Sequence, residues 1–340
     1  MKIIKWVIFC AVLLVLSACN LLLQEVTVNG VTDDGITWTY TGEARNGIFH
    51  GYGRIDWDNG TWYEGRWQFG RRTGHGVEFG FDAANVAFTY TGAFIDGYFD
   101  GHGRIEWECG AWYEGDWRRH ERQGLGTEFG INEDGTTWTY VGSFFQSLFH
   151  GSGRIEWDDG GWHEGEWYGG ERTGQGTQFG INEDGTTWTY VGDFYQSYLH
   201  GNGRIEWDNG GWYDGDWYWG ERTGHGTELV MDTTDGVFAY TGDFLNGYFH
   251  GVGRIEWVDR WWFEGNFLYG LYHGFGTMRG FDEYMGVQEW WTFEGTYQNG
   301  LRHGYGTFIW DDGSTQTDWW EYGEVADIRP RRAANRATVS

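Results

Sequence analysis

The chain has 340 residues, a formal net charge of −27, 60 glycines, one proline and 25 tryptophans, and aromatic residues make up 20 % of it. Because aromatic residues favour strands and glycines favour turns, this composition predicts many short strands joined by glycine turns and argues against a disordered chain. So acidic a protein repels phosphate backbones and anionic lipid surfaces, which argues against nucleic-acid binding.

The first 19 residues have the features of a secretory signal peptide. Lys2 and Lys5 precede an apolar run, residues 6–16, that is short for a membrane span. Residues 16–19 read Leu-Ser-Ala-Cys and resemble a bacterial lipobox, in which the cysteine is lipidated and becomes the new N-terminus. Ordinary signal cleavage is the other interpretation. We expect lipid chains on Cys19 to anchor the secreted protein to a membrane of the bacterial cell envelope.

Residues 20–37 are predicted to be a tether, and a repeat array follows over residues 38–323. The segment from Tyr40 to Tyr63 reads YTGEARNGIFHGYGRIDWDNGTWY, and nearly the same string returns every 50 residues. Each period contains two related units, and each unit has a G-x-G pair. The eleven units begin at Tyr40, Tyr63, Tyr90, Tyr113, Tyr140, His163, Tyr190, Tyr213, Tyr240, Phe263 and Phe293.

The spacing within a unit predicts how its strands pair. If residues 58–60, Asp-Asn-Gly, form a three-residue hairpin loop with the glycine in the left-handed conformation, Arg54 faces Glu64 and Gly53 faces Gly65. Side chains alternate between the faces of a strand, so the repeated tyrosines share one face and the tryptophans beside them share the other. We expect the glycines to leave room for the tyrosine rings against bare backbone.

The unit starts are alternately 23 and 27 residues apart until the last step of 30. Four extra residues lengthen each of two paired strands by two, so short and long hairpins should alternate. With residues 133–135 as the turn of a long hairpin, Glu128 faces Tyr140 and Gly126 faces Gly142.

The motif Y-E-G-x-W followed by H-G-x-G and a closing D-G, as in residues 63–76 and 293–306, resembles the MORN repeat (membrane occupation and recognition nexus). The resemblance covers residues 38–313. It implies an all-β fold, an elongated single-layer antiparallel sheet of about eleven tandem β-hairpins without a globular core. It also implies roles in scaffolding, membrane association and binding of partner peptides, and no catalytic activity of the repeats themselves.

The end of the chain differs from the repeats in composition. Residues 324–340 contain four arginines and no apolar period, which predicts a disordered basic tail.

Five arginines face acidic residues in the predicted register. A functional interpretation makes them a charged track for a ligand. We favour a ladder of cross-strand ion pairs, each contributing roughly 0.2–1 kcal/mol, because every charge already has a partner. The pairs are Arg54 with Glu64, Arg104 with Glu114, Arg154 with Glu164, Arg204 with Asp214, and Arg254 with Glu264.

Candidate metal and catalytic residues recur at spacings that separate them. Histidines begin the H-G-x-G motif, but those one period apart should be four strands, or roughly 19 Å, from each other, too far to share a zinc ion. The column of Glu78, Glu128 and Glu228 is spaced too widely for a glycosidase pair. After the signal peptide, Cys109 is the single cysteine. We expect no metal, no cofactor and no enzymatic activity.

The aromatic residues left over form a column on the face opposite the tyrosines. We expect a non-catalytic scaffold that binds a partner protein or peptide, of basic character, along this column. The alternative is a carbohydrate-binding module whose tryptophans stack on envelope glycans. A further alternative is that twist and ring packing hide most of the apolar surface of this column from solvent. The candidate residues are Trp62, Trp112, Trp162, Trp212, Trp262, Phe129 and Phe179.

Overall fold

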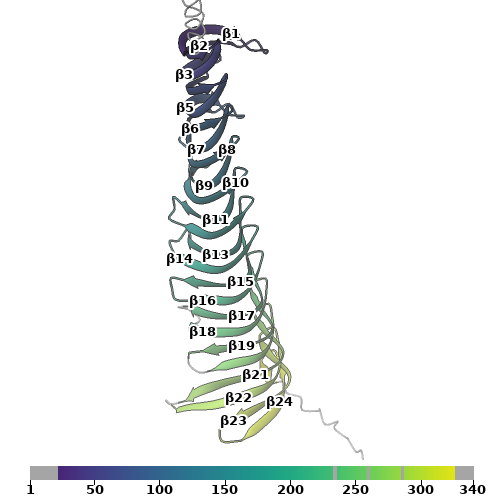
Figure 1. The fold of residues 1–340 in the computed structure, drawn as a ribbon. Coiled ribbons are helices and arrows are strands. Elements are labelled where there is room, and N and C mark those ends of the chain that lie inside the picture. The colour runs from purple at the N-terminus through teal and green to yellow at the C-terminus, as the bar shows by residue number, and fades with distance from the viewer. Residues whose placement is uncertain (1–21, 233–235, 259–260, 285–286, 326–340) are drawn as a thin grey trace, which may run out of the picture. The chain divides into compact units, whose positions relative to one another are not determined.

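The computed structural model describes residues 22–232, 236–258, 261–284 and 287–325 (Figure 1). The predicted signal peptide with Cys19, and residues 326–340 of the predicted tail, lie outside the described residues. The described part contains 25 strands and no helix. It divides into two compact units, residues 1–172 and 173–340, which are described separately.

The first unit is an antiparallel sheet in which each strand pairs with the next along the chain. Its strands are β1 (Gln24–Val31), β2 (Thr37–Arg45), β3 (Ile48–Trp57), β4 (Trp62–Gln68), β5 (Arg71–Phe81), β6 (Ala87–Ile95), β7 (Tyr98–Trp107), β8 (Trp112–Arg118), β9 (Glu121–Ile131), β10 (Thr137–Phe145), β11 (Leu148–Trp157) and β12 (Trp162–Tyr168).

The second unit repeats this arrangement, again with consecutive antiparallel pairing. Its strands are β13 (Glu171–Ile181), β14 (Thr187–Tyr195), β15 (Tyr198–Trp207), β16 (Trp212–Tyr218), β17 (Glu221–Asp232), β18 (Gly236–Leu245), β19 (Tyr248–Trp257), β20 (Trp262–Leu268), β21 (Leu271–Tyr284), β22 (Val287–Gln298), β23 (Leu301–Trp310), β24 (Thr315–Glu321) and β25 (Glu324–Val325). The predicted fold class, all-β with tandem antiparallel hairpins, is confirmed in both units.

The predicted strand register is present. Arg54 of β3 is the cross-strand partner of Glu64 of β4, and in the long hairpin of β9 and β10 Glu128 is the partner of Tyr140. The turn of the short hairpin closes with Trp57 donating its N–H to the carbonyl of Thr61, and Gly60 is left-handed with φ 88°. The turn of the long hairpin has the same hydrogen bonds, so its extra residues lengthen the strands and not the turn.

The opposite edge of each sheet has a second kind of connection, two-residue turns with both residues left-handed. Asn46 and Gly47, with φ of 53° and 75°, join β2 to β3 in this way. This geometry matches the twist of the flanking strands and favours asparagine and glycine. Arg119 and His120 nevertheless adopt it at φ of 49° and 69°.

The segment predicted to be a tether is partly a strand. Residues Gln24–Val31 form β1, which pairs with β2 along its whole length. Their alternating valines suit a strand, and the turn that follows is closed by a hydrogen bond from the Thr32 N–H to the carbonyl of Ile36. The sheet therefore begins one strand before the first repeat.

The tyrosine face, which we call the inner face, carries the core of each unit. The Tyr40 ring is fully buried, is stacked on Phe49 at 3.7 Å between ring centres, and meets Trp67 edge-on. The strands curve strongly (Figure 1), and the inner-face rings pack against one another within that curve. The resemblance implied no globular core, yet the rings form a continuous buried cluster within each unit.

The glycines of the repeat make this packing possible. The Tyr63 ring lies over the paired residues Gly65 and Gly76, and a Cβ on Gly76 would lie 2.6 Å from the ring. The Tyr63 hydroxyl donates to the carbonyl of Arg66, so the buried polar group has a partner. The prediction that the glycines leave room for the tyrosine rings is confirmed.

Candidate functional site

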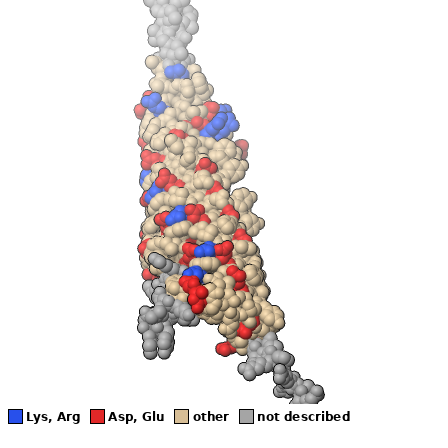
Figure 2. Space-filling view, turned by 90° about the horizontal axis from the view of Figure 1, so that it is seen from below, with Lys and Arg blue, Asp and Glu red and all other residues tan. Residues whose placement is uncertain are grey.

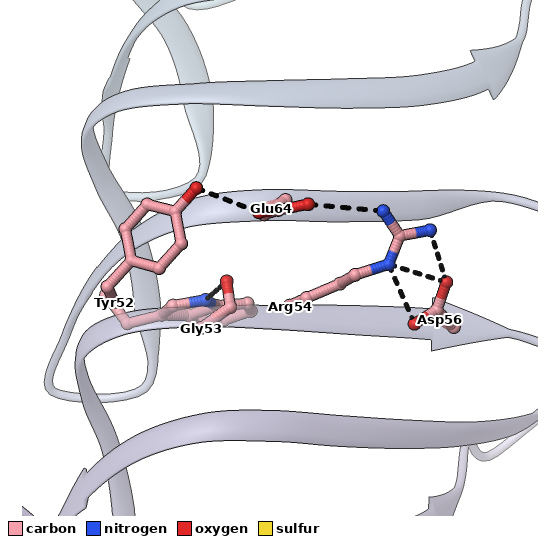
Figure 3. A network of polar contacts seen from close by, with 6 residues as sticks. Tyr52, Gly53, Arg54, Asp56 and Glu64 are labelled. Atoms are coloured by element: carbon pink, nitrogen blue, oxygen red, sulfur yellow. Dashed lines mark hydrogen bonds and ion pairs between the residues drawn. The ribbon is translucent and has the colours of Figure 1, made fainter. Parts of the chain in front are cut away.

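The outer face, opposite the tyrosines, carries a network of charged side chains centred on each arginine of the R-I-x-W motif. Arg54 Nη1 donates to Glu64 at 3.3 Å, and Arg54 Nε donates to Asp56 at 2.9 Å. Glu64 also accepts from the Tyr52 hydroxyl at 3.0 Å. Figure 3 shows the guanidinium held between the two carboxylates. The second acidic partner, two residues along the same strand, was not anticipated from the sequence.

The same cross-strand ion pair recurs along both units. The N–O distances are 3.0 Å for Arg104 with Glu114, 3.2 Å for Arg154 with Glu164, 3.6 Å for Arg204 with Asp214 and 2.8 Å for Arg254 with Glu264. In the space-filling view, basic and acidic side chains lie side by side with uncharged surface between them (Figure 2). The partners satisfy each guanidinium, so this face is a poor track for a charged ligand.

The tryptophan column lies on this outer face, but its rings are only half-exposed. The guanidinium carbon of Arg54 is 4.2 Å from the centre of the Trp62 ring, and the other four arginines cover Trp112, Trp162, Trp212 and Trp262 at 4.1–4.2 Å. Phe129 is stacked beside Trp112, and Phe179 is half-buried in β13. The column is thus largely occupied by the protein's own cations.

The glutamate column on the inner face is also structural. Arg72, six residues before Glu78, forms an ion pair with it and donates to the carbonyl of Gly97 at 2.8 Å. Burial raises the pKa of Glu78, and the arginine counteracts that rise. Arg122 with Glu128 and Arg222 with Glu228 repeat the arrangement. The arginine six residues before each glutamate was a signal in the sequence for this buried ion pair, which had not been predicted from it.

The histidines of H-G-x-G lie among aromatic rings. His200, for example, is half-buried between Tyr195 and Tyr218. Within the described residues, no group of three or more His, Cys, Asp or Glu side chains is arranged to hold a metal ion, and Cys109 is an exposed thiol. In that part of the chain, no helix is long and apolar enough to span a membrane.

Exposed apolar side chains gather instead along the edge formed by the two-residue turns, which we call the tight-turn rim. Phe69 and Tyr168 are 73 % and 71 % exposed there. The rim of the first unit consists of Ile48, Phe69, Ile95, Tyr98, Phe145, Leu148 and Tyr168. The rim of the second unit consists of Tyr195, Tyr198, Tyr218, Trp219, Tyr248, Leu268, Tyr269, Leu271, Leu301 and Tyr322.

The repeats that build this rim match a known family. The family model of the MORN repeat matches residues 40–62, 63–82, 90–108, 113–134, 140–162, 163–182, 190–212, 213–229, 240–261, 263–282 and 293–315, more than half of the chain. The chain belongs to the MORN-repeat family. MORN repeats are generally protein- or membrane-interaction modules, and proteins built from them are typically non-catalytic. A search of curated proteins found no match to this chain.

A group of exposed rings in the MORN array surrounds Trp219 in the second unit. Its ring centre lies 5.1 Å from Tyr198, 5.7 Å from Tyr195 and 6.1 Å from Tyr218. All four side chains remain accessible, with Tyr218 59 % exposed. The turn holds Trp219 at φ 50°, so a large ring occupies a position where glycine or asparagine is usual.

Sequence reasoning missed the tight-turn rim because it followed the other edge of the hairpins. A signal was present: an aromatic residue precedes the turn glycine at Phe69, Trp219, Tyr269 and Tyr322. Aromatic residues flanking a two-residue turn extend beyond the ladder, where no neighbouring strand can cover them.

Proposed function

We propose that this MORN-repeat protein is a non-catalytic scaffold that binds a partner protein along its tight-turn rim. The observation that carries the proposal is the concentration of exposed rings on the rim, above all around Trp219. Contiguous exposed apolar surface marks interaction sites, and Trp and Tyr are enriched at them. Rings fixed by a two-residue turn also lose little conformational freedom on binding.

The charge beside the rim around Trp219 favours a partner with basic residues around an apolar centre. Exposed Glu171 and Glu221 each follow a tight turn, and the chain carries a formal net charge of −27. Such charges accelerate association with basic partners and suppress acidic ones, and salt screens them. Association with the partner should therefore slow as ionic strength rises.

Membrane attachment is a second part of the proposal. The lipobox-like residues 16–19 support lipidation of Cys19, which would place the array at a membrane of the bacterial cell envelope. Strand β1 starts at Gln24, a few residues later, so the sheet would begin close to the lipid surface. Cys19→Ser should move the protein from the membrane fraction to the soluble fraction. Retention of this variant in membranes would refute the lipid anchor.

The rim can be tested by capturing partners from membranes with the intact protein. Tyr218→Gln and Trp219→Gly place on this rim the residues found at equivalent turns, Gln68 and Gly169. The double variant should fold normally and lose the partners that the parent protein retains. Val191→Thr, which copies Thr41 and removes an exposed apolar side chain from the outer face, is the control and should retain them.

Two outcomes of this capture would count against a rim-bound protein partner. Equal recovery of partners by the double variant and the parent would show that the rim is not the binding surface. Binding of the parent to purified envelope polysaccharide, lost in the double variant, would assign the rings to glycans instead. The arginines over the tryptophan column make that column the weaker platform for either ligand.

A further inference from the structure

The stretch from Trp261 to Met278, which contains the start of the repeat at Phe263, differs from the four equivalent stretches before it at a group of neighbouring positions. Tyr272 stands where the earlier repeats have Arg72, Arg122, Arg172 and Arg222. Met278 stands where they have Glu78, Glu128, Gln178 and Glu228. Leu271 replaces Arg71, Glu121, Glu171 and Glu221, and Trp261 replaces Thr61, Ala111, Gly161 and Gly211. Each change exchanges a charged, polar or small residue for a large apolar one.

These changes remove a polar bridge from the inner face. In the preceding repeat, Arg222 pairs with Glu228 and donates to the carbonyl of Gly247 at 3.0 Å. Gly300 is the counterpart of Gly247, and its N–H donates to the carbonyl of Tyr272 as that of Gly247 does to Arg222. This backbone hydrogen bond is therefore kept, while the guanidinium and the carboxylate are absent.

A cavity of about 480 Å³ lies at this place, within the second unit. Aromatic rings of four consecutive strands, β18 to β21, line it, among them Phe238, Phe249, Phe267 and Tyr272. Trp257 and Trp261 are stacked in parallel, 3.4 Å between ring centres, and both line the cavity. Leu271, 49 % exposed, lies at the tight-turn rim and forms part of the lining.

The lining sets the chemistry of the occupant. Among the described residues, no Asp, Glu, Lys or Arg lines the cavity, although the protein is strongly acidic and the equivalent position of the earlier repeats carries an ion pair. Sites for small molecules have volumes of roughly 300–1,000 Å³ and are lined mainly by apolar and aromatic side chains. An ionised group would lose part of its hydration there without gaining a charged partner among the described residues of the lining.

We propose that this cavity binds one small, uncharged, apolar molecule containing a flat ring system. The parallel Trp257 and Trp261 rings supply a stacking wall, and the changes at Trp261, Leu271 and Tyr272 supply part of the apolar lining. The proposal for this cavity does not rest on the partner protein proposed above, although Leu271 belongs both to the cavity lining and to the tight-turn rim.

The proposal can be tested with 2-naphthalenemethanol, a neutral two-ring alcohol, by equilibrium dialysis against the full chain at constant detergent concentration. One equivalent of the alcohol should bind to the chain. The affinity for 2-naphthoate, its anionic counterpart, should be lower by about tenfold or more. Trp261→Gly combined with Tyr272→Arg and Met278→Glu restores the residues of the preceding repeat and should reduce affinity for the alcohol by about tenfold or more.

Leu271→Glu is the second variant, because glutamate occupies the equivalent position in three earlier repeats and the side chain is exposed. It should fold normally and weaken binding of the neutral alcohol as well. The control is Leu301→Ile, which copies Ile48 on the rim outside the cavity lining and should leave the affinity unchanged. No binding by the parent chain, or equal affinity of the parent and Leu271→Glu, would overturn the proposal.

Discussion

The guanidinium carbon of Arg104 lies 4.1 Å from the centre of the Trp112 ring, while its Nη1 donates to Glu114 at 3.0 Å and its Nε to Glu106 at 2.7 Å. One side chain thus joins two strands by an ion pair and also covers an aromatic ring. The same group of contacts recurs in each 50-residue period, so repeated arginines add cross-strand contacts on the outer face to those of the backbone ladder.

Arg104→Gln should lower the free energy of unfolding by about 1–2 kcal/mol, because it removes the ion pairs and the cation over the Trp112 ring. Urea denaturation followed by circular dichroism measures the change. Arg71→Gln is the matched control, since Arg71 is 67 % exposed and its contact with Asp96 is 3.6 Å. The control should change stability by less than about 0.5 kcal/mol. Equal losses in the two variants would argue against a special role for the stacked arginine.

Exchanging the charges of Arg154 and Glu164 should also destabilise the protein, although the cross-strand pair itself is preserved. The introduced carboxylate would lie two residues from Glu156, and the guanidinium of Arg154 would no longer lie over the Trp162 ring. We expect a loss of about 1–2 kcal/mol in the double variant by the same denaturation measurement. Full recovery of parental stability would mean that the cross-strand pair is the only contribution of this arginine.

Gly76→Ala should be strongly destabilising, by about 2–4 kcal/mol, because its Cβ would lie 2.6 Å from the Tyr63 ring and the core has no free volume there. Thermal unfolding measures the effect. Gly47→Asn is the control, since nothing lies within 4 Å of that position and asparagine tolerates the left-handed conformation. A change of less than about 1 kcal/mol is expected for the control. If the alanine variant unfolded at the parental temperature, the glycines would not be needed for ring packing.

The buried tyrosines should make the array unfold in alkaline solution. Burial, with a smaller contribution from Glu43, raises the pKa of Tyr40 to about 12, and burial raises the pKa of Tyr63 further. Above the ordinary value of about 10, the unfolded chain releases these protons while the folded chain retains them, so stability falls as pH rises.

Tyrosinate absorbance and circular dichroism should change together in this alkaline transition. Tyr63→Phe, which copies Phe263 and Phe293, removes one such group and should move the transition to higher pH. Ionisation of all tyrosines near pH 10 with the circular dichroism unchanged would show that the inner-face hydroxyls are not buried.

The strand register could be predicted from the sequence because every copy of the repeat specifies the same pairing. The period and the three-residue turn at residues 58–60 fix the pairing of Gly53 with Gly65, and every copy of the motif gives the same answer. Strand β1 was not predicted because it has no repeat motif, and it forms by pairing with β2. Backbone pairing of an isolated segment leaves a weaker mark on sequence than a periodic motif.

The candidate site was harder to predict because contacts between diagonal neighbours decide exposure. Arg54 lies diagonally across the strand pair from Trp62, whose direct partner is Asp56. A long side chain can reach a diagonal neighbour, so the register alone left the ring apparently free. The rim residues at the two-residue turns were missed for the opposite reason, since they have no cross-strand partner beyond the turn that would reveal them.

At the two-residue turns, the backbone conformation needed for folding is independent of the side chain that is exposed for binding. Their backbone requirement is a left-handed conformation, which Gly169, Trp219 and Arg119 all meet in the same kind of turn. A residue can therefore be exchanged at one turn while the tyrosines, glycines and arginines of the repeat stay as they are. In such a sheet the repeated core stays constant, while the residue at each two-residue turn can vary independently of the others.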